Sequence, residues 1–288
     1  MRKWIIAVLT AVIAFSGCVP GQTKARLTVV TSFYPMYIMT ANLTKGIPGI
    51  NLVNMAPPST GCLHDYQMTP QDVKTLAQAD ILVINGVGME TFLDNVVRQN
   101  PNLKVVDASQ GIEVIEHEGH PNPHIFASIS GAIRQVQNIG AGLERYDPEY
   151  LGYYRENAQR YLVQLELLKD SMHFALKEIK NRDIVTFHEA FPYLAKELDL
   201  NIVAVVEKEP GAEPSAGDLA EIIKIVRQRK VKAIFAEPQY PAKSAEAIAR
   251  ETGAKVFLLD PAVTGPMELD AYIKIMEKNL KVLKEALK

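Results

Sequence analysis

Residues 147–181 read DPEYLGYYRENAQRYLVQLELLKDSMHFALKEIKN, with no proline after Pro148 and a single glycine, Gly152, near the beginning. Asp147 is expected to cap a helix that begins at Pro148. Apolar residues recur every three or four positions, at Tyr150, Tyr154, Ala158, Tyr161, Leu165, Leu168 and Met172. A helix over this whole stretch would be about 50 Å long. Neither half of the chain needs that length, so the pattern predicts a rigid strut between two lobes.

Short apolar strands alternate with helices on both sides of this strut. The expected strands are 27–33, 50–55, 80–85 and 103–107 before it, and 183–187, 201–206, 231–236 and 255–259 after it. Thr69 with Asp72, and Ser215 with Asp218, have the spacing of a capping box at a helix start, and a last helix is expected over 267–288. The alternation predicts two parallel-sheet α/β lobes, 27–146 and 182–288, joined by the helix at 147–181.

The first residues have the pattern of a secretory signal. Basic Met1-Arg2-Lys3 precedes an apolar run over 4–15, and small residues lead to Cys18. The pattern over 1–18 is similar to a bacterial lipobox, so Cys18 is expected to be the lipidated first residue of the mature protein, followed by a tether at 19–26. Phe15 replaces the usual leucine, which leaves plain secretion with a free or disulfide-bonded Cys18 as the alternative. Either way the sequence predicts an extracytoplasmic protein.

The composition is that of an ordinary globular protein. The chain has 288 residues, 48% hydrophobic and 22% charged, with a formal net charge of −2. Nucleic-acid binding is not expected, because it calls for a strongly basic face.

Four potential metal donors stand at predicted strand ends or in loops, two in each half of the chain. They are His64, His124, His188 and Asp260. Loops beyond the carboxyl ends of parallel strands converge, and three imidazoles with one carboxylate would saturate a tetrahedral zinc ion. The donors therefore predict a metal site in the cleft between the lobes.

Further residues near these donors have two interpretations each. Cys62 is a soft ligand or, as we expect, a small buried hydrophobe. Glu237 competes with Asp260 as a ligand or, as we expect, orients a ligating imidazole. His117 and His120 form an accessory metal-gathering loop or, as we expect, a solvated acidic turn. In addition, Gly86-Val87-Gly88 is interpreted as a turn into a helix, since the third glycine of a dinucleotide fingerprint is missing.

Six short motifs carry a resemblance to a known family. They are GCLHDY (61–66), ADILVING (79–86), NPHIF (122–126), FHEAFPY (187–193), IFAEPQ (234–239) and LDP (259–261). In this order around a long helix, over nearly all of 27–288, they resemble the zinc- and manganese-binding lipoproteins of bacterial ABC transporters, the cluster A-I family. The resemblance implies a monomeric receptor with metal ligands at His64, His124, His188 and Asp260. It further implies an ABC permease and its ATPase subunit as partners.

Two features qualify the resemblance. The long His/Asp-rich loop of many zinc members is reduced here to residues 115–121, and Phe126-Ala127-Ser128 departs locally from the family pattern. Family members with a carboxylate at the position of His188 tend to be manganese receptors, so the histidine favours Zn²⁺ over Mn²⁺. The rival of another class is a zinc metallohydrolase, although no motif supplies a general base beside an open coordination position. An adhesin role is also compatible with such a fold.

Overall fold

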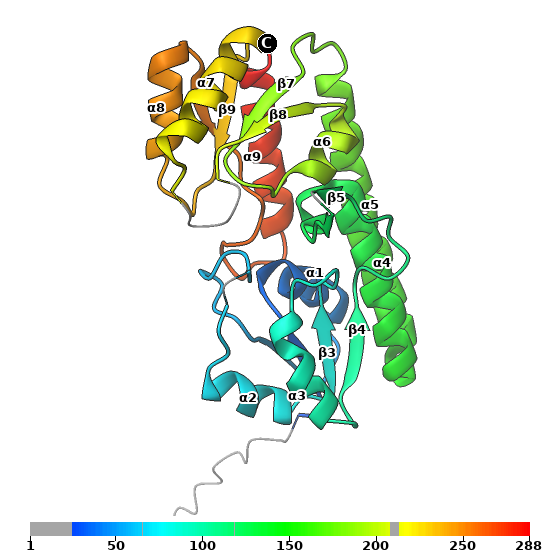
Figure 1. Cartoon of the computed structure of the whole chain (residues 1–288). Helices are drawn as coiled ribbons and strands as arrows, with labels where there is room; N and C mark the ends of the chain where they lie inside the picture. The colour runs from blue at the N-terminus through cyan, green and yellow to red at the C-terminus, as the bar shows by residue number, and fades with distance from the viewer. Residues whose placement is uncertain (1–24, 65, 118, 208–212) are drawn as a thin grey trace, which may run out of the picture.

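The computed structural model describes residues 25–64, 66–117, 119–207 and 213–288, and these form two α/β lobes along one long helix (Figure 1). The predicted signal peptide, Cys18 and most of the tether lie outside the described residues. Among the described helices, none has the length and apolar character needed to cross a membrane.

The N-terminal lobe is built on a four-stranded parallel sheet in the order β2-β1-β3-β4. Its strands are β1 (Leu27–Thr31), β2 (Ile50–Asn54), β3 (Ile81–Ile84) and β4 (Lys104–Asp107). Its helices are α1 (Tyr34–Thr44), α2 (Pro70–Ala77), the 3-10 turn η1 (Thr91–Leu93), α3 (Asp94–Gln99), η2 (Ile125–Ala127) and α4 (Ile129–Tyr146). A small hairpin, β5 (Glu116–His117) and β6 (His120–Pro121), precedes η2.

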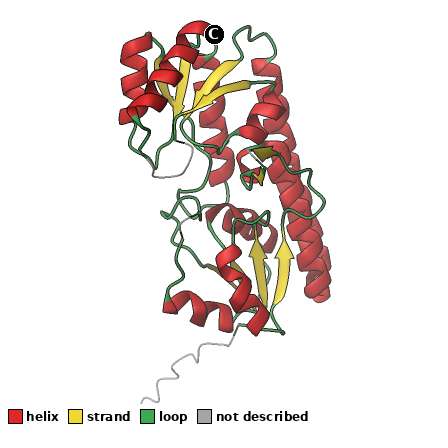
Figure 2. Ribbon diagram, in the orientation of Figure 1, coloured by secondary structure: helices red, strands yellow, loops and turns green. Residues whose placement is uncertain are grey.

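The C-terminal lobe repeats this topology. Its parallel sheet has the order β10-β9-β7-β8, from β7 (Asp183–Thr186), β8 (Asn201–Val205), β9 (Ala233–Ala236) and β10 (Lys255–Leu258). Its helices are α6 (Pro192–Leu198), α7 (Ala216–Arg229), α8 (Lys243–Thr252) and α9 (Ala271–Ala286). In each lobe the first strand is therefore central, between the second and third. The strands of each sheet lie between helices, and the arrowheads of β3 and β4 point toward the other lobe (Figure 2).

All eight predicted strands are present. Six of them end one or two residues earlier than expected, whereas β4 and β9 end where expected and begin one and two residues later. The residues left over, such as Ser32, Phe187 and Leu259, begin the loops between the lobes. Both predicted capping boxes are confirmed at the starts of α2 and α7, where the Thr69 and Ser215 side chains accept from backbone N–H groups three residues on.

The long helix is shorter than predicted. It begins with the 3-10 turn η3 (Pro148–Tyr150) and continues as α5 (Leu151–Leu176), about 39 Å at 1.5 Å per residue. The predicted capping by Asp147 is wrong, because its side chain makes no cap hydrogen bond. Instead the Asp147 carboxylate accepts two hydrogen bonds from the Arg26 guanidinium, at 2.7 and 2.8 Å, and one from the Tyr154 hydroxyl at 2.7 Å. The carboxylate thus ties the helix to the start of β1.

One hydrophobic cluster runs through both lobes along α5. The buried face of the helix includes Tyr154, Tyr161, Leu165 and Met172, which belong to the same cluster as Val29 of β1, Leu194 of α6 and Tyr272 of α9. Two smaller clusters lie under the outer faces of the two sheets. The Tyr272 hydroxyl also donates to the Phe126 carbonyl at 2.9 Å, across the junction. This continuous core holds the strand ends of the two lobes opposite each other.

Candidate metal site

The first donor loop follows β2 and presents Cys62 and His64. Leu63, between them, is completely buried in the central cluster. The Tyr66 backbone N–H donates to the Leu63 carbonyl at 3.1 Å, and the Tyr66 hydroxyl donates to the Asp72 carboxylate at 2.9 Å. The loop is therefore fixed at both Leu63 and the capping box of α2.

His124 lies at the start of η2 and is buried. Its Nδ1 is 3.1 Å from the side-chain oxygen of Asn122, which also accepts from the His124 backbone N–H at 3.0 Å. An amide oxygen only accepts hydrogen bonds, so Nδ1 carries the proton and Nε2 presents its lone pair. Asn122 reaches the other lobe as well, because its side-chain nitrogen donates to the Glu189 carbonyl at 2.8 Å.

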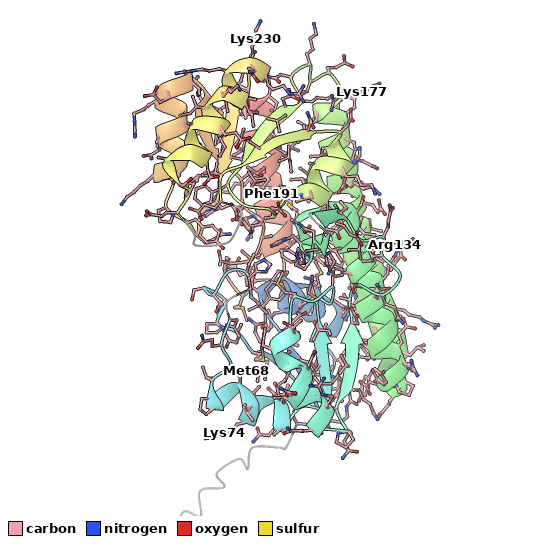
Figure 3. All side chains as sticks on the ribbon, viewed as in Figure 1. Met68, Lys74, Arg134, Lys177, Phe191 and Lys230 are labelled. Atoms are coloured by element: carbon pink, nitrogen blue, oxygen red, sulfur yellow. The ribbon has the colours of Figure 1, made fainter. Side chains whose placement is uncertain are left out.

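His188 stands two residues after β7 and is also buried. Its Nδ1 makes a short hydrogen bond to Oε1 of Glu237, which follows β9 and is completely buried. The second carboxylate oxygen of Glu237 accepts from the Gln239 side chain at 2.8 Å. Such a carboxylate fixes the tautomer and raises the basicity of the opposite nitrogen, Nε2. Phe191, labelled near the junction of the lobes in Figure 3, is buried in the central cluster and anchors the loop after His188.

The three predicted histidines converge. His64 Nε2 is 3.1 Å from His124 Nε2, and the His124 and His188 rings are 5.2 Å apart between centroids. The donor atoms of Cys62, His64, His124 and His188 all lie within 4.8 Å of one another. The three histidines border a cleft of about 340 Å³ lined by His64, Val87, Gly88, His120, Pro121, Asn122, Pro123, His124, His188 and Glu189. Side chains from both lobes thus surround one point.

Asp260 is held differently. Its backbone N–H donates to the Asn279 side-chain oxygen at 2.9 Å, and its carboxylate accepts from the Ala262 N–H at 2.8 Å. In the described part of the chain, the group of donor atoms within 4.8 Å does not include this carboxylate. Burial raises the pKa of Asp260, and the charge of Glu237 adds to the rise. The carboxylate therefore belongs to the same region, but it is engaged by its own turn.

The electrostatics of the site favour neutral donors. Burial lowers the pKa of His124 well below its usual value, and His188 and His64 lower it further. Burial raises the pKa of the Cys62 thiol, helped by the charge of Glu237. Without a cation, His124 is an unprotonated imidazole and Cys62 a thiol. Neutral imidazoles are the form that binds metal.

The hairpin of β5 and β6 stands at the edge of the same cleft. His120, on β6, is exposed and contributes to the cleft lining, whereas His117 lies in β5. The Tyr193 hydroxyl joins the hairpin to the C-terminal lobe, because it accepts from the Ile115 N–H and donates to the Asn122 carbonyl, at 3.1 and 2.8 Å.

The Gly86-Val87-Gly88 segment is a turn, as expected. All three residues have positive φ, including Val87 at 53°. A β-branched residue in this region is strained. Buried Glu90 accepts from the backbone N–H groups of Asn85 and Gly86 at 2.7 and 3.1 Å, so its carboxylate holds the turn.

Sequence reasoning gave too little weight to two residues. Asn122 appeared only as part of a motif, and its place two residues before His124 was the available signal. Cys62, likewise two residues before a histidine, was weighed more as packing than as a donor. The spacing does not reveal that Asn122 hydrogen-bonds to the His124 ring, or that the Cys62 sulfur lies beside His188.

Comparison with known proteins agrees with this geometry. The model of the family described as zinc-uptake complex component A, periplasmic (ZnuA), matches residues 29–286. The high-affinity zinc uptake system protein ZnuA of Bacillus subtilis is 31% identical over 316 residues, which cover 99% of this chain and 98% of that protein. The zinc-binding lipoprotein AdcA of Streptococcus pneumoniae is 28% identical over 302 residues, and the match spans 98% of this chain and 60% of AdcA.

Solved structures show the same architecture. The substrate-binding protein FpvC from Pseudomonas aeruginosa, in complex with Mn²⁺, superposes with a TM-score of 0.83 at 29% identity, covering 91% of this chain and 98% of FpvC. The resemblance carried by the six motifs is confirmed. The chain belongs to the periplasmic zinc-uptake complex component A family.

Proposed function

We propose that this chain captures Zn²⁺ outside the cytoplasm and delivers it to an ABC-type permease and its ATPase subunit. The main supporting observation is the convergence of three imidazoles from both lobes. The buried rings of His124 and His188 are oriented by hydrogen bonds to Asn122 and Glu237 respectively. Donors that surround an ion on several sides suit capture, whereas catalysis on zinc keeps one position open. The zinc-binding relatives support the same function.

We assign the ion to His64, His124 and His188. Asp260 is retained as the carboxylate donor implied by the family resemblance. Because its carboxylate lies outside the present group of donor atoms, it would have to move toward the three histidines to reach the ion. Glu237 acts as the partner of His188, and His120 with His117 as an accessory loop at the cleft edge.

Mn²⁺ is the second candidate, favoured by its presence in the related FpvC structure. The donors of this chain argue for zinc, since imidazole-rich tetrahedral sites suit Zn²⁺ and oxygen-rich sites suit Mn²⁺. Anchoring through a lipid on Cys18 and a monomeric state complete the proposal. Cys18→Ser should then release the protein from the membrane fraction.

Two assays test the function. A competition titration with a fluorescent chelator should give tight, stoichiometric zinc binding, and uptake of radioactive zinc by cells under zinc limitation should require the chain. His188→Ala should abolish both while far-UV circular dichroism stays unchanged. Wild-type uptake in cells lacking the chain, or hydrolysis of generic esters by the zinc-loaded protein, would contradict a transport receptor.

A further inference from the structure

A sulfur atom lies among the histidine nitrogens. Cys62 Sγ is 4.0 Å from Nε2 of His188, and it belongs to the group of donor atoms within 4.8 Å. Cys62 comes from the N-terminal lobe and His188 from the C-terminal lobe, so this contact crosses the cleft.

Two of the separations between donor atoms are close to those of a tetrahedral zinc site. With Zn–S near 2.3 Å and Zn–N near 2.0 Å, a zinc ion holds sulfur and nitrogen about 3.6 Å apart and two nitrogens about 3.3 Å apart. The sulfur-to-nitrogen distance here is 4.0 Å, and the two histidine nitrogens of the N-terminal lobe are 3.1 Å apart. Shifts of a few tenths of an ångström would therefore fit these pairs to one ion.

We propose that Cys62 is a zinc ligand, and that its sulfur takes the fourth position beside His64, His124 and His188 in the arrangement described above. The inference rests on the proposed function and deepens it. Asp260, whose carboxylate lies outside the donor group, is then a competing ligand that has to move toward the histidines to reach the ion.

The buried side chain of Leu63 fixes the position of Cys62. Leu63 is buried in the core between Cys62 and His64, so both donors flank one buried anchor and belong to the same group of donor atoms. Cys62 itself packs partly against the central cluster. Its sulfur is held in place by the fold and needs no loop closure to approach His188.

Binding would exchange a proton for a metal bond. The Zn–S bond forms as the thiol S–H bond breaks, one water leaves the zinc ion, and the proton passes to solvent. Burial raises the pKa of the thiol in the metal-free protein, but a coordinated divalent cation deprotonates a thiol outright. No oxidant or reductant is needed.

The sulfur also bears on metal choice. Thiolate is a soft ligand that selects zinc, whereas Mn²⁺ prefers carboxylate, carbonyl and water. Cys62 would therefore raise the preference of this site for Zn²⁺ over Mn²⁺ beyond what the three imidazoles provide.

Cobalt substitution tests the Zn–S bond directly. All proteins carry Cys18→Ala, so Cys62 is the single thiol of a chain with two cysteines. The Co²⁺-loaded parent should show an intense near-ultraviolet thiolate-to-cobalt charge-transfer band. This band should vanish in Cys62→Ser and persist in Asp260→Asn. Its absence from the parent, or its survival in Cys62→Ser, would overturn the inference.

Competition titrations with Zn²⁺ and Mn²⁺ separate this inference from the proposed function. Cys62→Ser should lose about ten-fold or more in zinc affinity and less in manganese affinity. Cys62→Ala controls for binding by the serine hydroxyl. If Cys62→Ser keeps full zinc affinity while His188→Ala loses it, the role of Cys62 fails and the proposed function stands. If Cys62→Ser and His188→Ala both keep full zinc affinity, the role of Cys62 and the proposed function both fail.

Discussion

The two lobes share one sheet topology but present their donors in different ways. In the C-terminal lobe, His188 and Glu237 lie within two residues of the ends of central strands, are buried, and are hydrogen-bonded to each other. In the N-terminal lobe, Cys62 and His64 stand on a loop well beyond β2, and His64 is exposed. Each central strand of a parallel sheet is fixed by two neighbours, whereas a loop is fixed only where its side chains are anchored.

This difference suggests two roles. The C-terminal lobe offers the ring of His188, whose orientation is fixed before metal binds, so little conformational entropy is lost on binding. The N-terminal lobe offers an exposed imidazole that meets the ion first. His124, buried and oriented by Asn122, resembles the C-terminal donors although it belongs to the N-terminal half.

The largest expected effect comes from removing the donors themselves. His188→Ala and His124→Ala should each weaken zinc binding about a thousand-fold or more, and His64→Ala about a hundred-fold, because the exposed ring is less oriented. Competition titration measures each affinity. His173→Ala, which removes a histidine on α5 paired with Glu197, is the matched control and should have no effect. Equal losses of zinc affinity in all three variants would contradict the difference between the oriented, buried rings and the exposed ring of His64.

The orienting partners come next. Glu237→Ala should lower zinc affinity by about a hundred-fold and Asn122→Ala by about ten-fold, within the range seen for partners of ligating histidines. Glu237→Gln should lower zinc affinity by about ten-fold, since the amide oxygen still accepts a hydrogen bond from Nδ1 of His188 but lacks the charge of the carboxylate. Isothermal titration calorimetry in competition with a chelator measures these differences in zinc affinity. An unchanged affinity in Glu237→Ala would mean that His188 needs no partner.

The buried imidazole of the N-terminal lobe predicts a pH dependence. The pKa of His124 is lowered from 6.5 in the folded protein, so below that pH the unfolded chain binds more protons. The stability of the metal-free protein should therefore fall as pH drops through 6.5, by at most about 1.4 kcal/mol per pH unit for this group. Urea midpoints with a chelator present, at about pH 7.5 and about pH 5.5, measure the slope. His124→Gln should flatten it, and an equal slope would exclude His124 as its source.

The smallest effect concerns one strained residue in each lobe. Val87 and Ala262 have φ of 53° and 62°, and each stands beside donor residues. Val87→Gly and Ala262→Gly should each stabilise the metal-free protein by up to about 1 kcal/mol, because glycine tolerates this backbone. The stabilisation should be larger for Val87→Gly, since the valine side chain is β-branched. Thermal unfolding compares them. Destabilisation at both positions would show that side-chain packing outweighs the strain.

Much of this architecture follows from local patterns. Strands, capping boxes and the long helix were predictable because apolar spacing and cap residues act over a few positions. The end of α5 at Leu176 was not, since no proline or glycine stops the helix there. The role of Asp147 was missed because its partner, Arg26, is distant in the sequence.

The candidate site divides in the same way. His64, His124 and His188 were recognisable from strand-end positions and motifs. The sequence could not reveal that Cys62 lies closer to the other donors than Asp260 does, because that depends on how two loops from different lobes meet. It also could not tell that one oxygen of Asp260 is engaged by the Ala262 N–H.

The most direct measurement is a crystal structure of the zinc-loaded protein with anomalous diffraction at the zinc edge. The account predicts one strong peak in the interlobe cleft, about 2.0 Å from Nε2 of His64, His124 and His188. A zinc peak bound by other residues, or a peak touching the donors of one lobe alone, would contradict it.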